Sequence, residues 1–240
     1  GGDGIILVCP SKVADAKMKM YNLDGSEGKM CGNGIRCVGK FLYDHGMVDI
    51  NEKDEITIET LSGIKKLKAY TSGGKVNRLR VDMGKAILEP KEIPVVLDGD
   101  KVVDRPVEIA GKNYNITCVS MGNPHCVVFM DDIDNLDIET VGPEFENDKL
   151  FPERVNTEFV TVLDDHTIKM RVWERGSGET WACGTGACAV AVAACENGFC
   201  KKGEDIKIKL KGGDLIINYT DETVYMTGNA EKVFEGEVEV

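Results

Sequence analysis

Residues 31–46 read CGNGIRCVGKFLYDHG, and residues 183–198 read CGTGACAVAVAACENG. Each stretch opens with Cys-Gly-x-Gly, continues as an apolar run, and closes on a glycine fifteen residues after its cysteine. A glycine that follows the last apolar residue of a helical pattern is typical of a helix end. The two stretches therefore predict two equivalent helices, each with a cysteine at its N-terminus.

The sequence around the two helices repeats as well. KMKMYNLDGSEGKMCGNG at 17–34 matches IKMRVWERGSGETWACGTG at 168–186 with one extra residue, and each helix is followed by a similar alternating segment, ITIET or IKIKL. A long internal repeat indicates a duplicated fold. We predict an α+β protein of two pseudo-symmetric domains, each a curled, mostly antiparallel sheet wrapped around one central helix. A duplicated fold of this kind is expected to place the equivalent helix ends at a cleft between the domains.

Alternating apolar positions bounded by turn residues predict the strands. A helical part is expected within the acidic segment 131–150, and Gly122 to His125 is expected to interrupt the strands. The predicted strands are 5–8, 17–23, 55–60, 65–70, 78–82, 102–109, 114–120, 126–130, 156–163, 167–174, 206–210, 214–219, 223–227 and 232–240.

Composition excludes several classes of protein. The formal net charge of −12 argues against nucleic acid or an anionic membrane as partner, because both require a basic surface. No apolar run reaches the roughly 18 residues of a membrane span, and no signal peptide is recognisable. We therefore expect a cytoplasmic protein, and the acidic charge does not identify its substrate.

The nine cysteines fit the same compartment. An odd number of cysteines without a signal peptide predicts reduced thiols, and the absence of a CxxC pair argues against a zinc site. The cysteines are Cys9, Cys31, Cys37, Cys118, Cys126, Cys183, Cys188, Cys195 and Cys200.

Cys31 and Cys183 stand apart because of their positions. The positive end of the helix dipole and the unpaired N–H groups of the first turn favour a thiolate there. The following glycines leave the backbone open, so a ligand carboxylate can reach those N–H groups. Two such cysteines could remove a proton from one face of a carbon and return one to the other face. The alternative is a pair of buried cysteines that cap core helices, and the matched repeat argues against it.

Other polar residues give weaker signals when taken alone. Asn123 and His125 flank a proline and could form a plain turn, or could supply an amide and an imidazole beside a thiol. Glu174-Arg175 could be a surface ion pair, or could bind a substrate ammonium and carboxylate. Asn22 and Asn156 are ambiguous from position alone.

Three stretches strongly resemble the diaminopimelate epimerase family: YNLDGSEGKMCGNGIRC at 21–37, GNPHCVVF at 122–129 and ERGSGETWACGTGACA at 174–189. The resemblance runs from Gly1 to Val240. It implies a cofactor-independent isomerase that interconverts LL- and meso-diaminopimelate in lysine and peptidoglycan precursor biosynthesis, without a metal and commonly as a homodimer. It implies one domain of residues 1–85 with 230–240, to which the last strand crosses back, and a second domain of residues 86–229.

The resemblance also assigns roles to residues. Cys31 and Cys183 would be the two bases, with His125 and Glu174 near the sulfurs to set their protonation. The residues that would hold the reacting α-carboxylate are Gly32, Asn33, Gly184 and Thr185. The residues that would bind the rest of the substrate are Asn22, Asn123, Asn156, Glu174 and Arg175, of which Arg175 and the asparagines would hold its distal end.

One part of the family pattern has no counterpart. Family members carry a further N-terminal segment with a substrate-binding asparagine, and nothing in these 240 residues corresponds to it. A molecule that started at Gly1 is expected to lack strands of its first sheet and part of its site.

Four alternatives compete with this interpretation. Proline and hydroxyproline racemases share the two-cysteine chemistry but carry His where this chain has Asn33, and they lack the ERGSGET stretch. A carboxylate-dependent isomerase would not need both cysteines. A thiol-rich metal or redox module, and an inactive fragment that retains the fold, are the other two.

Overall fold

The structure is a computed structural model that describes residues 4–22, 24–50 and 55–238. The chain divides into two compact units. The first unit is Gly1–Asp82 together with Thr227–Val240, and the second unit is Met83–Met226. The C-terminal residues thus belong with the N-terminal part of the chain.

In the first unit the strands lie in the order β1-β2-β4-β5-β6, with the short β3 beside β2. Their bounds are β1 (Gly4–Cys9), β2 (Ala16–Asn22), β3 (Glu27–Gly28), β4 (Ile56–Thr60), β5 (Gly63–Ser72) and β6 (Lys75–Asp82). β2 and β4 pair in parallel, and the other pairs along this path are antiparallel. β4 alternates buried and half-buried positions, as a strand with one face on a core does.

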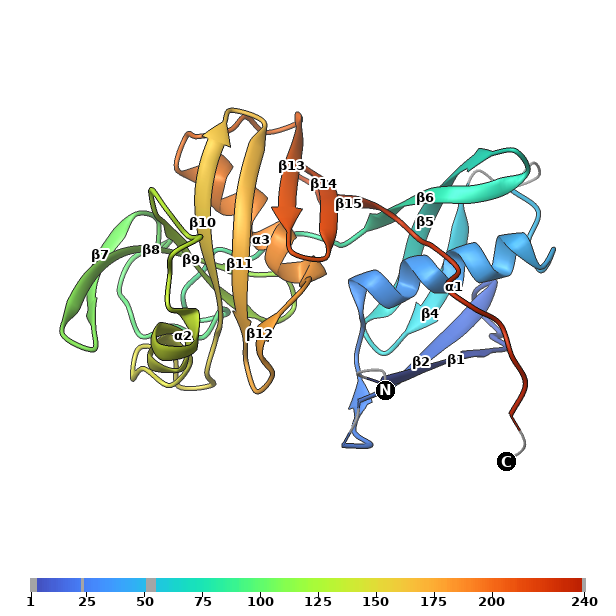
Figure 1. Ribbon diagram of the computed structural model, residues 1–240, viewed down its shortest axis with the longest axis horizontal. Coiled ribbons are helices and arrows are strands. Elements are labelled where there is room, and N and C mark those ends of the chain that lie inside the picture. Colours follow the sequence, from blue (N-terminus) through green and yellow to red (C-terminus); the bar gives the residue numbers. More distant parts are fainter. Residues whose placement is uncertain (1–3, 23, 51–54, 239–240) are drawn as a thin grey trace. The chain divides into compact units, whose positions relative to one another are not determined.

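Helix α1 (Gly32–Asp44) packs against β4, β5 and β6 of this sheet (Figure 1). Its buried Ile35, Val38 and Leu42 recur at helical spacing and form its core-facing stripe. Gly39 lies where the helix comes closest to the sheet. A Cβ at Gly39 would lie 2.5 Å from a methyl group of Leu79 and 2.9 Å from one of Leu67. The sequence therefore places a glycine where no side chain fits.

In the second unit the strands lie in the order β14-β13-β11-β10-β9-β8-β7, with β12 beside β11. β15 lies next to β14, and its last residues, from Thr227 on, belong to the first unit. Two of these pairs, β9 with β10 and β11 with β13, are parallel. The bounds are β7 (Arg105–Ile109), β8 (Lys112–Ser120), β9 (Pro124–Phe129), β10 (Asn156–Asp164), β11 (Thr167–Glu174), β12 (Gly178–Thr180), β13 (Asp205–Leu210), β14 (Gly213–Tyr219) and β15 (Val224–Asn229).

Helix α3 (Gly184–Glu196) is the central helix of the second unit. It contacts β8, β9, β10, β13 and β14, so the sheet curls around it (Figure 1). Ten of its thirteen residues are buried, and most are alanine, valine or glycine. Small side chains on every face let strands approach the helix from several directions.

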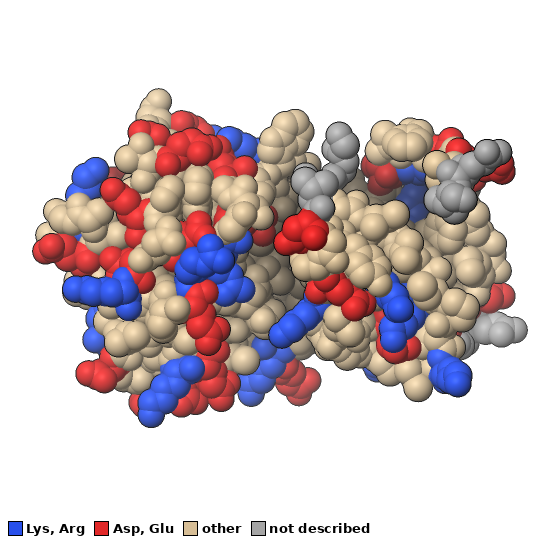
Figure 2. Space-filling model, turned by 90° about the horizontal axis from the view of Figure 1, so that it is seen from below, with Lys and Arg blue, Asp and Glu red and all other residues tan. Residues whose placement is uncertain are grey.

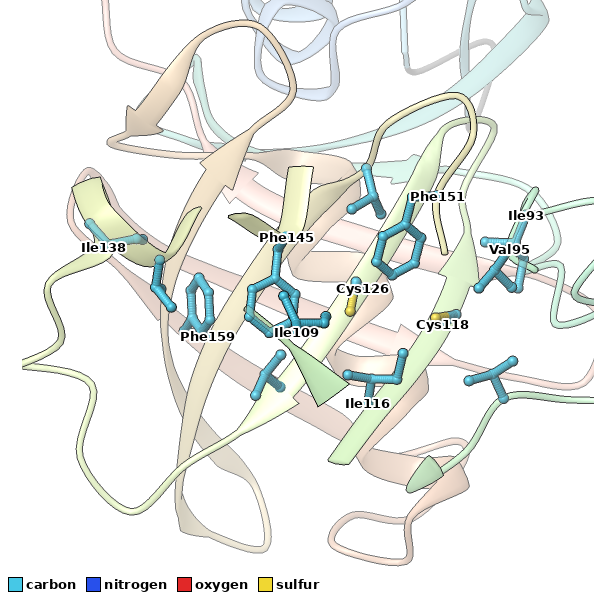
Figure 3. Packing of buried hydrophobic residues seen from close by; sticks show 14 of the residues in the cluster. Ile93, Val95, Ile109, Ile116, Cys118, Cys126, Ile138, Phe145, Phe151 and Phe159 are labelled. Atoms are coloured by element: carbon cyan, nitrogen blue, oxygen red, sulfur yellow. The ribbon is translucent and has the colours of Figure 1, made fainter. Parts of the chain in front are cut away.

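Helix α2 (Ile138–Glu146) covers a further core on the other face of β8–β10. Figure 3 shows Phe145 of α2 beside Phe159 of β10, with ring centroids 5.4 Å apart at an interplanar angle of 88°. This edge-to-face geometry is the favoured one for an aromatic pair. Cys118 and Cys126 are part of this core, and all nine cysteines are free thiols, as predicted.

The predicted α+β class, with a curled sheet around a central helix in each unit, is confirmed. No helix in the described part of the chain is long and apolar enough to cross a membrane. On the face shown in Figure 2, acidic and basic side chains are interspersed.

Two predictions about strands were wrong. Residues 231–238 form no strand, and Val233 and Phe234 are 89% and 85% exposed; residues 239–240 lie outside the described part. Alternation predicts a strand locally, but a strand also requires a partner edge. Pro124 and His125 do not interrupt the sheet and instead begin β9, since a proline is tolerated at the first position of a strand.

Candidate active site

Cys31 is the N-cap residue of α1. Its backbone is extended, and its Sγ accepts a hydrogen bond from the Gly34 N–H at 3.3 Å. A Cβ at Gly34 would clash with a terminal methyl group of Ile6 and would lie at an ordinary van der Waals distance, 3.4 Å, from this sulfur. The Cys31 side chain is half-buried. The structure thus places this thiol at a helix N-terminus, as predicted.

Arg36 supports this helix start from one turn further along. Its side chain is buried, and one terminal nitrogen donates to the Gly32 carbonyl at 3.0 Å and to Asn33 Oδ1 at 3.1 Å. Its Nε donates to the Asn229 carbonyl at 3.2 Å. Because Asn33 Oδ1 accepts from Arg36, the amide NH₂ of Asn33 is the group that remains for a ligand.

Cys183 is the N-cap residue of α3 and is more deeply buried, at 5% exposure. Its Sγ lies 3.6 Å from the Thr185 hydroxyl. Burial raises the pKa of the Cys183 thiol well above its ordinary value, and the carboxylates of Glu174 and Glu158 raise it further. This finding corrects the expectation of an easily ionised thiol at both helix N-termini. At Cys183, desolvation outweighs the helix N-terminus.

A series of polar contacts leads away from Cys183. The Asn123 amide donates to the Thr185 hydroxyl oxygen at 3.3 Å, and Asn123 Oδ1 lies 3.1 Å from His125 Nε2. His125 Nδ1 lies 2.7 Å from Glu158 Oε1. His125 and Glu158 are both completely buried. Two sequence-predicted residues, Asn123 and His125, are therefore brought to the Cys183 end of α3.

Glu174 is the last residue of β11, and Arg175 follows it in the turn to β12. Glu174 Oε1 accepts from the Thr180 hydroxyl at 2.5 Å. The Arg175 backbone N–H donates to Asn156 Oδ1 at 3.0 Å, and the buried Asn156 donates in turn to the Pro124 carbonyl at 2.8 Å. Asn156 thus joins this turn to the start of β9, where Asn123 and His125 are found.

A buried glutamate on α2 holds the same turn. Glu146 Oε1 accepts from the Gly176 N–H and from Arg154, both at 2.9 Å, and its Oε2 accepts from Trp173 Nε1 at 2.7 Å. Gly176 has a φ of 78°, which a glycine adopts without strain. Glu146 of α2 therefore holds the turn that follows Glu174 in place.

Asn22 ends β2 in the first unit. Its amide donates to the Ser26 hydroxyl at 3.0 Å, so it closes its own turn. The group of potential metal ligands found among the described residues consists of the exposed Asp164, Asp165 and His166. The His166 ring already pairs with Asp165 and Glu204.

The family model for diaminopimelate epimerase matches residues 1–89 and 117–233. The chain belongs to the diaminopimelate epimerase family. It is 53% identical to the diaminopimelate epimerase of Acetivibrio thermocellus over 242 aligned residues, which cover 100% of this chain and 85% of that relative. The diaminopimelate epimerase of Methanococcus maripaludis is 51% identical, with 100% of this chain and 86% of the relative covered. The family predicted from the three motifs is confirmed, and the chain is an epimerase-class isomerase.

The fold is shared more widely than the family. The crystal structure of a probable proline racemase from Agrobacterium radiobacter matches with a TM-score of 0.70 at 17% identity, over 94% of this chain and 73% of the other. A phenazine biosynthesis protein of the PhzF family from Bacillus anthracis matches with a TM-score of 0.68 at 19% identity, over 100% of this chain and 86% of the other. At these identities the likeness concerns the fold alone.

Sequence reasoning missed the buried charged residues behind the site: Arg36, Glu146 and Glu158. A signal was present for two of them. Arg36 falls on the apolar side of α1. Glu158 falls in β10 between Thr157 and Phe159, which are both buried. A charged residue at a core position is uncommon and is usually paired, so both positions pointed to a partner.

Proposed function

We propose that this enzyme interconverts LL- and meso-diaminopimelate by moving the α-proton with two cysteines, Cys31 and Cys183. The single observation that carries the proposal is that a cysteine occupies the N-cap of the central helix in each unit, followed by glycine. The high identity to enzymes named diaminopimelate epimerase supports the choice of substrate. The nine free thiols support a cytoplasmic location, and family analogy supports a homodimer.

The proposed reaction consists of two proton transfers, one from the α-carbon to a sulfur and one from the other sulfur to the α-carbon. A thiolate takes the α-proton, so a C–H bond breaks, an S–H bond forms and the electron pair stays on the carbon. The other thiol then gives its proton to the opposite face of that carbon, so its S–H bond breaks and a new C–H bond forms. After one turnover the two sulfurs have exchanged protonation states. The reaction needs no cofactor because the thiols are both acid and base.

The charge that develops on the substrate needs stabilisation. When the α-proton leaves, negative charge spreads onto the α-carboxylate, and N–H groups at a helix N-terminus stabilise it. Gly32 and Gly184 leave this backbone open, while Asn33 and Thr185 add side-chain donors. We assign the α-carboxylate to these four residues.

The remaining polar residues suit the other groups of a diamino diacid. The Glu174 carboxylate would bind an ammonium group, and the Arg175 guanidinium would bind the distal carboxylate through the donors that its bond to Glu153 leaves over. Asn22, Asn123 and Asn156 would help to hold the distal end. His125 and Glu174 would influence the protonation of the sulfurs.

The raised pKa of Cys183 suggests the order of events. A buried thiol beside two carboxylates holds its proton at neutral pH, so Cys183 would be the proton donor in the resting enzyme. Cys31 would then remove the first proton. The resting enzyme would therefore convert the isomer that Cys31 deprotonates, without first exchanging protons between the two cysteines.

Proton exchange tests this proposal. LL-diaminopimelate incubated with the protein in deuterated water should gain deuterium at the α-carbon and form the meso isomer, as followed by NMR and chiral chromatography. Proline in the same assay serves as the control substrate and should gain none. A folded wild-type protein that leaves diaminopimelate unlabelled, or that labels proline instead, would contradict the proposal.

A further inference from the structure

Glu158 is the most deeply buried acid of the second unit that the proposed reaction leaves without a role. It lies on β10, its residue is 0% exposed, and its position faces the start of α3. A buried carboxylate without a partner is strongly unfavourable. One oxygen, Oε1, contacts His125 Nδ1 at 2.7 Å, while Oε2 is buried without a hydrogen-bond partner in the described part of the chain. A half-satisfied buried carboxylate calls for a functional explanation.

The sequence makes room for this carboxylate at the start of the helix. A Cβ at Gly186 would lie only 2.6 Å from Glu158 Oε1 and 3.2 Å from the Met170 methyl group. Gly186 is in the first turn of α3, three residues after Cys183. The glycine therefore allows an acid to lie directly against the turn that carries the reactive sulfur.

A second route joins Glu158 to the same sulfur. Both ring nitrogens of His125 face oxygen atoms, Glu158 Oε1 and Asn123 Oδ1, so a ring that is protonated on both nitrogens satisfies both contacts. With its carbonyl facing His125, the Asn123 amide presents its NH₂ to the Thr185 oxygen. The Thr185 hydroxyl is then oriented beside the Cys183 sulfur.

We infer that Glu158 is a positioning residue for Cys183. Through His125 it fixes Asn123 and Thr185 beside the sulfur, and its negative charge against the first turn of α3 favours the thiol form of Cys183. The inference rests on the proposed function, in which Cys183 is the resting proton donor. Glu158 itself touches neither substrate nor reacting atoms in this assignment.

The charged groups around Cys183 come from three strands. Glu158 lies on β10, Glu174 at the end of β11, and His125 on β9. Burial raises the pKa of the Glu158 carboxyl, and the contact with His125 lowers it and so favours the carboxylate. The carboxylates of Glu174 and Glu158 raise the pKa of the Cys183 thiol, whereas the Thr185 hydroxyl and the Gly186 N–H lower it. Removing the charge of Glu158 while keeping its shape should therefore make Cys183 easier to ionise.

Thiol reactivity measures this effect without relying on turnover. Cys31 and Cys183 are labelled with methyl methanethiosulfonate over a range of pH, and their rates are read separately by peptide mass spectrometry. In Glu158→Gln we expect the Cys183 profile to move to lower pH, with about tenfold faster labelling near neutral pH, which corresponds to about one pKa unit. The plateau at high pH and the Cys31 profile should stay unchanged.

Glu196→Gln is the matched control. Glu196 is a part-buried carboxylate at the other end of α3, where it accepts from Lys101 and Tyr219. This variant should leave the Cys183 profile unchanged. An unshifted Cys183 profile in Glu158→Gln would overturn the inference, and so would an equal change at Cys31 or a raised plateau, because either would indicate general loosening.

Two further measurements distinguish a failure of this inference from misfolding of the variant and from a failure of the proposed function. If Glu158→Gln does not fold, ¹⁵N NMR of histidine in the wild-type protein decides: a protonated Nδ1 on His125 is expected, and a bare Nδ1 overturns the inference. In the deuterium assay, a wild-type protein without exchange would overturn the proposed function. Normal wild-type exchange, with an alkaline limb of kcat that stays in place in Glu158→Gln, would overturn the inference alone.

Discussion

Cys31 and Cys183 cap their helices with nearly the same backbone, at φ −131° and ψ 116° for the first and φ −121° and ψ 111° for the second. Their surroundings differ in charge. Cys31 is half-buried and is followed by Gly32, whose carbonyl accepts from the Arg36 guanidinium, whereas Cys183 is buried near the carboxylates of Glu158 and Glu174. The duplication therefore kept the helix start and changed the charges around it. This inequality supports the proposal that Cys183 starts the reaction as the thiol.

The largest expected effect tests whether the two cysteines are equally necessary. Cys31→Ala and Cys183→Ala should each lower kcat for epimerisation by about 10³-fold or more, because inversion needs an acid and a base on opposite faces. Cys37→Ala, at an exposed thiol of α1, is the control and should retain activity. If either variant at Cys31 or Cys183 kept a tenth of the wild-type rate, the two-base proposal would be wrong.

The glycines of the two first turns offer a sharper comparison. Gly186→Ala would press a methyl group onto the buried Glu158 carboxylate at 2.6 Å, so we expect a loss of about 1–3 kcal/mol in the free energy of unfolding. Gly34→Ala would meet a terminal methyl group of Ile6, which is half-buried and can rotate away, so the change should stay below about 1 kcal/mol. Urea unfolding measures both, and equal losses would contradict the contrast.

The next effect concerns the thiols of the wild-type protein. The pKa of Cys183 is raised, so at pH 7 less of it is thiolate, and its labelling should accelerate only at higher pH than that of an ordinary cysteine. We expect Cys31 to be labelled at least about tenfold faster than Cys183 at pH 7, since it is also more exposed. Faster labelling of Cys183 would reverse the assignment of resting donor and acceptor.

The smallest expected effect concerns Arg36. Its guanidinium donates to Gly32, Asn33 and Asn229, and lysine cannot reproduce that planar fork. Arg36→Lys should cost about 1 kcal/mol in the free energy of unfolding and raise KM through a less fixed Asn33. Arg78→Lys on β6 is the control. The exposed Arg78 guanidinium lies 5.6 Å from the centroid of the Tyr70 ring, a cation–π contact that a lysine can also make, so stability should change by less than about 0.5 kcal/mol. A neutral Arg36→Lys would show that the guanidinium is not what holds this helix start.

The repeat made the fold accessible from sequence. The two Cys-Gly-x-Gly stretches predicted both central helices and their N-caps, and alternation predicted most strands. It failed at residues 231–238, because a pattern of side chains does not reveal whether a partner edge exists. The buried residues Arg36 and Glu158 stood out in the sequence only as charges at core positions, and the identity of their partners was out of reach. Glu158 reads as one charge in a strand until the fold brings Gly186 and His125 against it.

The direction of the pKa shift at Cys183 could not be predicted from the sequence either. A helix N-terminus is visible in the sequence and favours a thiolate, but burial depends on how strands from across the second unit close around α3. Here burial is the larger influence, and two carboxylates act in the same direction. Local sequence thus predicted where the sulfur is and not which protonation state its surroundings favour.

The bond from Arg36 to Asn229 joins residues 193 positions apart and bears on the order in which the protein can assemble on the ribosome. The second unit, Met83–Met226, is one continuous stretch of chain, whereas the first unit needs Thr227–Val240. Translation therefore supplies every residue of the second unit before the first unit has received its last ones. Helix α1 is made first but would be the last to gain its full set of contacts, because the first unit would lack its C-terminal residues while the second unit folds.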